Sequence, residues 1–222
     1  MERVTYRWSG GHLFLEVAGA VWLVDTGAPV SFGAREAFTL AGEVFQLSRH
    51  HRGLSVEALS GFVGVECAGL LGVDVLGRFD FLLDAPRGVA TISTADLEHR
   101  GAIVELDDIM GVPIVSARVG GADHRMFLDT GAPLSYLQRE ALAAFPSAGR
   151  AADFHPSVGQ FQTETHSVEV ALAGVDFTLR CGVLPEALGA SLLPTGIAGI
   201  IGSAVFADRV VGYFPRRRRL VL

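Results

Sequence analysis

Residues 23–31 read LVDTGAPVS, and residues 127–135 read FLDTGAPLS. The aspartates of these two segments, Asp25 and Asp129, are 104 positions apart, close to half of the 222-residue chain. Each aspartate follows an apolar stretch that has the character of a β-strand. A period of this length is too long for a solenoid repeat, and it indicates two copies of one domain.

Other segments repeat in the same order, which extends the match beyond the aspartates. TLAGEVFQL (39–47) matches ALAGVDFTL (171–179), and AGLLGVDVL (68–76) matches AGIIGSAVF (198–206). The charged stretch TADLEHRGAIVE at residues 94–105 separates the two copies. We therefore predict an N-terminal domain of residues 1–97 and a C-terminal domain of residues 98–222.

The composition fits two compact domains. Half of the residues are hydrophobic and 19% are charged, so the chain can bury two cores and is not expected to be disordered. Short runs rich in Val, Ile, Phe and Leu, bounded by Gly, Asp and Pro, predict an all-β class. Helical signals are few: residues 138–144 (QREALAA) are the clearest, and short helical turns are expected after Gly72 and Gly202.

One Asp-Thr-Gly triplet is a weak signal, because Asp and Gly also favour ordinary β-turns. Two copies in matching contexts favour a pair of carboxylates instead. With the later GLLG (69–72) and GIIG (199–202), these motifs resemble those of the retropepsin- and pepsin-type aspartic peptidases. The resemblance covers nearly the whole chain, with lobes of retroviral size fused in one polypeptide.

This resemblance implies an all-β, bilobal acid-protease fold of two related β-barrel-like lobes, with a cleft between them and the termini in a shared sheet. It also implies that each hydrophobic–hydrophobic–Gly strand runs beside an aspartate loop. The catalytic residues would be Asp25 and Asp129. In aspartic proteases, as is well known, two carboxyl groups about 3 Å apart share one proton, because they cannot both ionise. The ionised partner takes a proton from water, and the protonated partner donates to the peptide carbonyl.

The residues that follow each aspartate are expected to support the loops. Gly27 and Gly131 allow a tight turn, so that backbone N–H groups approach the carboxylates. By resemblance, Thr26 and Thr130 would hydrogen-bond across the interface between the lobes.

Ala28 and Ala132 stand where pepsin-like enzymes usually carry Ser or Thr and where retroviral enzymes carry Ala. Without a hydroxyl, fewer hydrogen bonds favour the ionised dyad, and its pKa values should be higher. We therefore expect activity to peak at weakly acidic pH.

The second half contains about 28 more residues than the first between matching landmarks. They include DFHPSVGQFQTETHSVEV (153–170), whose strand-like pattern predicts a single β-hairpin flap in the C-terminal lobe. The N-terminal lobe has no obvious flap. Candidate substrate contacts are Ser157, Val158, Gly159, Gln160 and Phe161. The alternative is a solvent loop unrelated to catalysis.

The predicted function is hydrolysis of polypeptide by an aspartic endopeptidase that is complete as a monomer. Two alternatives stay open: a catalytically weak peptide-binding or scaffold protein on the same fold, and a highly selective processing protease. No metal or organic cofactor is implied. A net charge of −6 argues against nucleic acid, and no apolar run is long enough for a membrane span. No signal peptide is visible, so a cytoplasmic location is expected.

Two charged or polar runs receive structural interpretations. His50 and His51 are adjacent and lack a nearby third ligand, which favours a solvated loop over a metal site. Arg216–Arg219 are expected to alternate along a terminal edge strand, where their charges would discourage aggregation.

Overall fold

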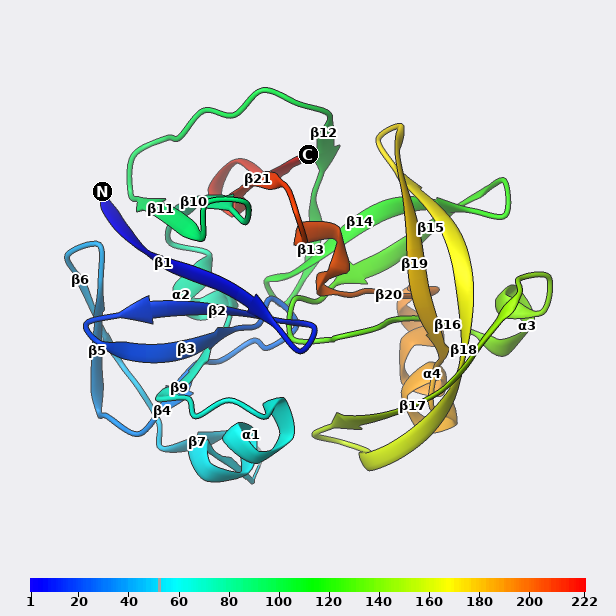
Figure 1. The fold of residues 1–222 in the computed structure, drawn as a ribbon, viewed down its shortest axis with the longest axis horizontal. Coiled ribbons are helices and arrows are strands. Elements are labelled where there is room, and N and C mark those ends of the chain that lie inside the picture. Colours follow the sequence, from blue (N-terminus) through cyan, green and yellow to red (C-terminus); the bar gives the residue numbers. More distant parts are fainter. Residues whose placement is uncertain (52) are drawn as a thin grey trace.

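The computed structural model describes residues 1–51 and 53–222, and it is predominantly β (Figure 1). The prediction of an all-β class is confirmed. The larger sheet has ten strands, in the order β12 (Ile103–Glu105), β22 (Arg219–Val221), β21 (Val210–Phe214), β10 (Asp80–Asp84), β11 (Val89–Ser93), β1 (Glu2–Ser9), β2 (His12–Val17), β3 (Ala20–Val24), β9 (Gly69–Leu71) and β4 (Phe32–Gly33).

A second sheet is built from later residues of the chain. Its order is β13 (Asp107–Ile109), β14 (Val112–Val119), β15 (Ala122–Leu128), β20 (Gly199–Ile201), β16 (Ser135–Leu137), β19 (Val175–Val183), β18 (Gly159–Leu172) and β17 (Ser147–His155). Two small hairpins complete the strands: β5 (Ala37–Leu40) with β6 (Glu43–Gln46), and β7 (His50–His51) with β8 (Leu54–Ser55).

The centre of the ten-stranded sheet reflects the sequence repeat. β10 pairs antiparallel with β21, with Phe81 opposite Tyr213. β11 and β1 follow β10 on one side, while β22 and β12 follow β21 on the other. Strands near both ends of the chain thus lie in one sheet, as predicted. Apolar side chains from both sheets meet in one continuous core, which includes Trp22, Phe81, Met126, Leu179 and Phe206. Burial of each such side chain stabilises the fold by about 1.5–3 kcal/mol relative to exposure.

The helices are short, and the sequence predicted only some of them. α3 (Arg139–Leu142) lies within the predicted helical segment, and α2 (Val73–Leu76) and the 3₁₀ helix η2 (Ser203–Phe206) follow Gly72 and Gly202 as expected. The remaining helices lie outside the predicted segments: α1 (Val56–Val63), α4 (Glu186–Leu192), η1 (Leu193–Thr195) and η3 (Pro215–Arg217). None of the helices in the described part of the chain has the length and apolar composition needed to cross a membrane.

Among these four helices, α1 has a side-chain cap at its start. The Ser55 side chain accepts a hydrogen bond from Ala58 N–H at 3.3 Å, which caps the first turn. Gly64 ends the helix with a φ of 68°, a conformation that glycine adopts without strain. Gly61 inside the helix weakens its helical signal in the sequence.

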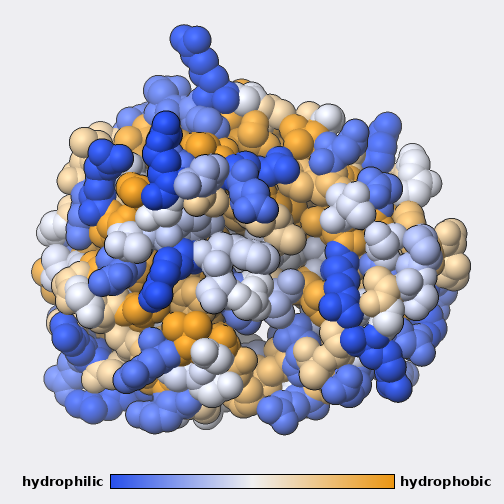
Figure 2. Space-filling view, in the orientation of Figure 1, coloured by the Kyte–Doolittle hydropathy of each residue, from blue (hydrophilic) through white to orange (hydrophobic). Residues whose placement is uncertain are grey.

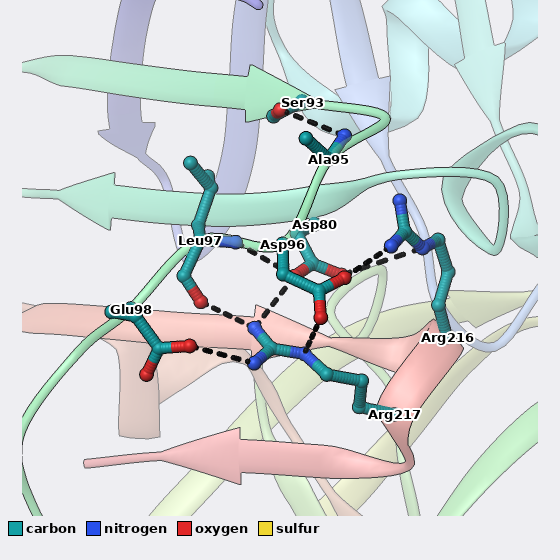
Figure 3. Close-up of polar contacts among 8 residues, drawn as sticks. All are labelled: Asp80, Ser93, Ala95, Asp96, Leu97, Glu98, Arg216 and Arg217. Atoms are coloured by element: carbon teal, nitrogen blue, oxygen red, sulfur yellow. Dashed lines mark hydrogen bonds and ion pairs between the residues drawn. The ribbon is translucent and has the colours of Figure 1, made fainter.

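The arginine run differs from the prediction. Arg216 and Arg217 lie in η3, and β22 is not an edge strand, because it pairs with both β12 and β21. Figure 3 shows instead that both side chains face Asp80, whose side chain is completely buried. Arg217 Nη2 lies 2.7 Å from Asp80 Oδ2, and the N–H of Leu97 donates to the same oxygen at 3.1 Å.

The same arginines hold the connection between the two halves. Arg217 also bonds Glu98 at 3.1 Å and the Leu97 carbonyl, while Arg216 pairs with Asp96. These contacts hold residues 96–98, which belong to the charged stretch between the two copies, against the ten-stranded sheet. A buried carboxylate needs such partners, because an unpaired charge in the protein interior is strongly destabilising.

Candidate active site

The two aspartate loops are positioned in the same way by parallel strand pairs. Asp25 follows β3, which pairs with β9, and Asp129 follows β15, which pairs with β20. Asp25 N–H donates to the Leu71 carbonyl at 3.0 Å, and Asp129 N–H donates to the Ile201 carbonyl at 2.9 Å. The GLLG and GIIG strands therefore lie directly beside the aspartate loops, as predicted.

Two buried threonines join the loops through four hydrogen bonds. Thr26 Oγ1 donates to the Leu128 carbonyl at 2.6 Å and accepts from Thr130 N–H at 3.0 Å. Thr130 Oγ1 donates to the Val24 carbonyl at 2.8 Å and accepts from Thr26 N–H at 3.0 Å. Each hydroxyl thus bonds the opposite loop twice, which holds the two aspartates in a fixed relation.

Gly27 and Gly131 explain how closely the carboxyl groups approach. A Cβ atom on Gly27 would overlap the Asp129 carboxyl group, and one on Gly131 would lie 2.5 Å from Asp25 Cγ. Neither glycine has the left-handed φ that would make its backbone freedom essential. The need for glycine is therefore one of space: each glycine lies against the carboxyl group of the other half.

Backbone N–H groups stabilise both carboxylates. Asp25 Oδ1 accepts from Gly27 N–H at 2.9 Å and from Ala28 N–H at 3.0 Å. Asp129 Oδ1 accepts from Gly131 N–H at 2.9 Å. Ala28 donates its backbone N–H to the Asp25 carboxylate. A serine or threonine at this position would offer a side-chain hydroxyl as well.

The surroundings raise the pKa of both aspartates. Burial raises the pKa of Asp25 well above its usual range, and the charge and hydrogen bond of Asp129 raise it further. Burial also raises the pKa of Asp129, although hydrogen bonds from Asp25 and Gly131 and the nearby His155 oppose this effect. The pair consequently retains a proton at a pH where isolated carboxyl groups would both be ionised.

The dyad opens into two cavities that meet beside Asp25. The larger has a volume of about 810 Å³, and the smaller, about 150 Å³, is lined by both aspartates. The surface is hollowed below the centre of the view in Figure 2, between the parts that carry α1 and β17.

The predicted flap region forms a hairpin of β17 and β18, joined by a turn at residues 156–158. Of the five candidate residues, Ser157, Gln160 and Phe161 line the cavities. Val158 and Gly159 shape the turn: Val158 N–H donates to the His155 carbonyl at 2.9 Å, and Gly159 has a φ of 82°. These last two are not among the residues that line either cavity.

The first half supplies a wall opposite this hairpin, which the sequence did not indicate. His51, Leu54, Leu59 and Phe62 line the larger cavity from β7, β8 and α1. The Phe62 ring stacks on Phe154 of β17, with ring centroids 3.7 Å apart and an angle of 12° between the planes. The hairpin of one half therefore touches the helix of the other across the cavity. His51 is thus a cavity residue, which corrects the expectation of a solvated loop at this position.

Sequence reasoning also missed three polar residues near the dyad. Asp153 lines both cavities and accepts a hydrogen bond from the Tyr136 hydroxyl, whose pKa is raised by burial. His12 lines the larger cavity. His12 directly follows the Gly10–Gly11 turn, and Tyr136 lies seven residues after Asp129. These two positions in the sequence are the signals that could have pointed to His12 and Tyr136.

No group of three or more His, Cys, Asp or Glu side chains within residues 1–51 and 53–222 has an arrangement that can hold a metal ion. No protein-family model matches the chain, and no curated protein matches its sequence.

Proposed function

We propose that this chain is a single-chain aspartic endopeptidase of the retropepsin and pepsin type. The observation that carries the proposal is the mutual packing of the two aspartate loops, in which each loop's glycine abuts the other's carboxyl group. Two carboxyl groups in such contact share one proton, which provides an acid and a base in the same site.

In the proposed reaction the ionised carboxylate removes a proton from a water molecule held between Asp25 and Asp129. The water oxygen forms a bond to the peptide carbonyl carbon, while the protonated carboxyl group donates its proton to the carbonyl oxygen. The resulting tetrahedral diol collapses, the C–N bond breaks, and the amine takes up a proton. The pair titrates as a unit, so the acid and base roles belong to the dyad.

The finer fold is part of the same proposal: two related β-barrel-like lobes, residues 1–97 and 98–222, with the cleft between them. The symmetric centre of the ten-stranded sheet and the matched loops support this division. Because both aspartates belong to one chain, a monomer is sufficient for activity. The free, buried thiols of Cys67 and Cys181 are consistent with a cytoplasmic protein.

The proposed substrate is an extended polypeptide bound as a strand in the cavity. The β17–β18 hairpin would act as the flap, and its stacking contact with Phe62 supports a closed position over the dyad. Neither nucleic acid nor a membrane is proposed as a partner.

A diverse peptide library, incubated with the purified protein, tests the proposal. We expect cleavage that a pepstatin-like inhibitor blocks and that Asp25→Asn and Asp129→Asn abolish. Cleavage restricted to a few sequences would indicate a selective processing protease. Binding of peptides without cleavage would contradict the enzyme and favour the scaffold alternative.

A further inference from the structure

Tyr136 and Phe32 occupy the same place in the two halves, but only the tyrosine has a hydroxyl group. Each lies seven residues after the aspartate of its half. Tyr136 of β16 pairs with Ile200 of the GIIG strand, and Phe32 of β4 pairs with Leu70 of the GLLG strand. Both aromatic side chains are buried. The chemical difference between the two positions is therefore the phenolic oxygen.

This hydroxyl group holds a carboxylate of the β17–β18 hairpin. Tyr136 Oη donates to Asp153 Oδ2, and Phe154 N–H donates to Asp153 Oδ1 at 2.7 Å. The Tyr136 ring packs tightly on β19, where a Cβ atom on Gly182 would lie 2.6 Å from Tyr136 Cε1. Because both oxygens of Asp153 have a donor and one of these donors is fixed in the core, the carboxylate has a defined position.

Asp153 is partly buried and lines both cavities beside the dyad. In the described part of the chain, no side chain forms an ion pair with it. Arg180 lines the larger cavity, but its guanidinium bonds other oxygen atoms, those of Thr165, Ala148 and Arg150. A bound cation would offset the cost of removing the Asp153 carboxylate from water when a ligand fills the cavity.

The smaller cavity combines this carboxylate with apolar walls. The walls include Tyr136, Phe161, Leu188 and Ile200. The other ionisable side chains that line it are Asp25, His51, Asp129 and His155. Lysine and arginine have an apolar stem and a cationic end, so the stem can lie along the walls while the end bonds Asp153.

The larger cavity has a different wall beside Asp25. Leu23, Phe32, Leu59 and Leu70 line it there, and they pack together in one buried apolar cluster. Phe32 has no polar atom with which to hold a carboxylate, as Tyr136 does in the second half. This wall therefore favours an apolar side chain.

We propose that Asp153 is a specificity-determining residue, which selects lysine or arginine next to the scissile bond while the Phe32 wall accepts an apolar side chain. The effect on cleavage rests on the proposed peptidase function, whereas the preference of the cavity for a cation does not. The two halves thus share the chemistry of the dyad but recognise different side chains.

Matched peptides test this specificity. The probes are alanine octapeptides that have Phe and one variable residue at the two central positions, in both orders. The variable residue is Lys, norleucine or Glu. In one of the two orders, wild-type kcat/KM should be at least about tenfold higher for Lys than for norleucine, the effect of one hydrogen bond to a charged group, and lowest for Glu. Equal kcat/KM values for Lys and norleucine in both orders would overturn the proposal.

Three variants assign the preference to Asp153. Asp153→Asn keeps an acceptor for the Tyr136 hydroxyl and removes the charge, so the ratio of Lys to norleucine should fall to about one. Tyr136→Phe gives the second half the residue of the first and should lower the ratio by less. Glu164→Gln removes the same charge from the same hairpin, at a residue that pairs with Arg139 at 2.8 Å, and should keep the wild-type ratio. A ratio unchanged in Asp153→Asn, or lost equally in Glu164→Gln, would contradict the assignment.

Binding separates this inference from the proposed function. If the wild-type protein cleaves none of the peptides, that result counts against the peptidase, and fluorescence anisotropy of the same labelled peptides decides the role of Asp153. We expect the Lys peptide to bind wild type at least about tenfold more tightly than the norleucine peptide, and Asp153→Asn to bind both alike. Equal affinities of wild type for the two peptides would overturn the inference.

Discussion

The Asp25 and Asp129 loops are alike where the carboxyl groups meet and different in what surrounds them. Both have the threonine that bonds the opposite loop, the glycine that abuts the opposite carboxyl group, and a parallel strand alongside. Around the first loop, Ser31 donates to Asp74 through both its N–H, at 2.9 Å, and its hydroxyl, at 2.6 Å. The equivalent of Asp74 in the second half is Ala204, which cannot accept such bonds.

The cavity walls differ even more. The second half provides the long β17–β18 hairpin, whereas the first provides the short β7–β8 hairpin and α1. The contrast indicates that the features which bring two carboxyl groups together require two similar halves. The cavity walls, which would hold a substrate of the proposed enzyme, do not require such similarity, and in these walls the two halves differ.

The largest effect on kcat is expected from substitution of the aspartates, which both loops have. Asp25→Asn and Asp129→Asn should each lower kcat at least about a thousandfold, because either change removes the shared proton and its acceptor. Steady-state cleavage of a library-derived peptide measures this. If one variant kept a tenth of the wild-type kcat, the two aspartates would not act as one unit.

The next effect concerns the hairpin that only the second half has. Removal of residues 156–158 should lower kcat/KM about a hundredfold, because closure over the dyad orients the substrate. The melting temperature should change little, since residues 156 and 157 are exposed. Shortening the turn at Ala173 and Gly174, between β18 and β19, is the matched control and should preserve activity. Equal losses in the two deletions would contradict the flap assignment.

The threonine bridge should be costly to break from either side. Thr26→Val leaves the buried Thr130 N–H and Leu128 carbonyl without their partner, so the free energy of unfolding should fall by about 2 kcal/mol. Thr130→Val should cost a similar amount. Chemical denaturation of both single variants and the double variant would measure the coupling. Strictly additive losses would show that the two hydroxyls do not form one network.

The smallest effect should come from the contact that is unique to the first loop. Asp74→Ala makes this loop resemble the second and removes the acceptor of Ser31, whose side chain is buried. Because Asp74 itself is exposed, we expect a loss of only about 0.5–1 kcal/mol in unfolding free energy, measured by the same denaturation. A loss as large as that of the threonine variants would show that the first loop depends on Asp74 for its structure.

The sequence predicted the aspartate loops well because their chemistry is local and occurs twice. Asp25, Thr26 and Gly27 are consecutive, and so are their counterparts, so the repeat identified them together. His12, Tyr136 and Asp153 escaped notice because strand pairing and contacts between the halves bring them to the dyad. The arginine run was misinterpreted for a similar reason: its partner Asp80 is 137 positions away from Arg217.

The pH dependence of kcat/KM is the sharpest test of a single proton shared by Asp25 and Asp129. Both groups are protonated at low pH, so no base is present, and both are ionised at high pH, so no acid is present. Because burial raises the pKa of both groups, and the charge of Asp129 raises that of Asp25 further, we predict a bell-shaped profile with its maximum at weakly acidic pH. A maximum below about pH 3, or a profile that depends on one ionisation only, would show that the two carboxyl groups do not share a proton in this way.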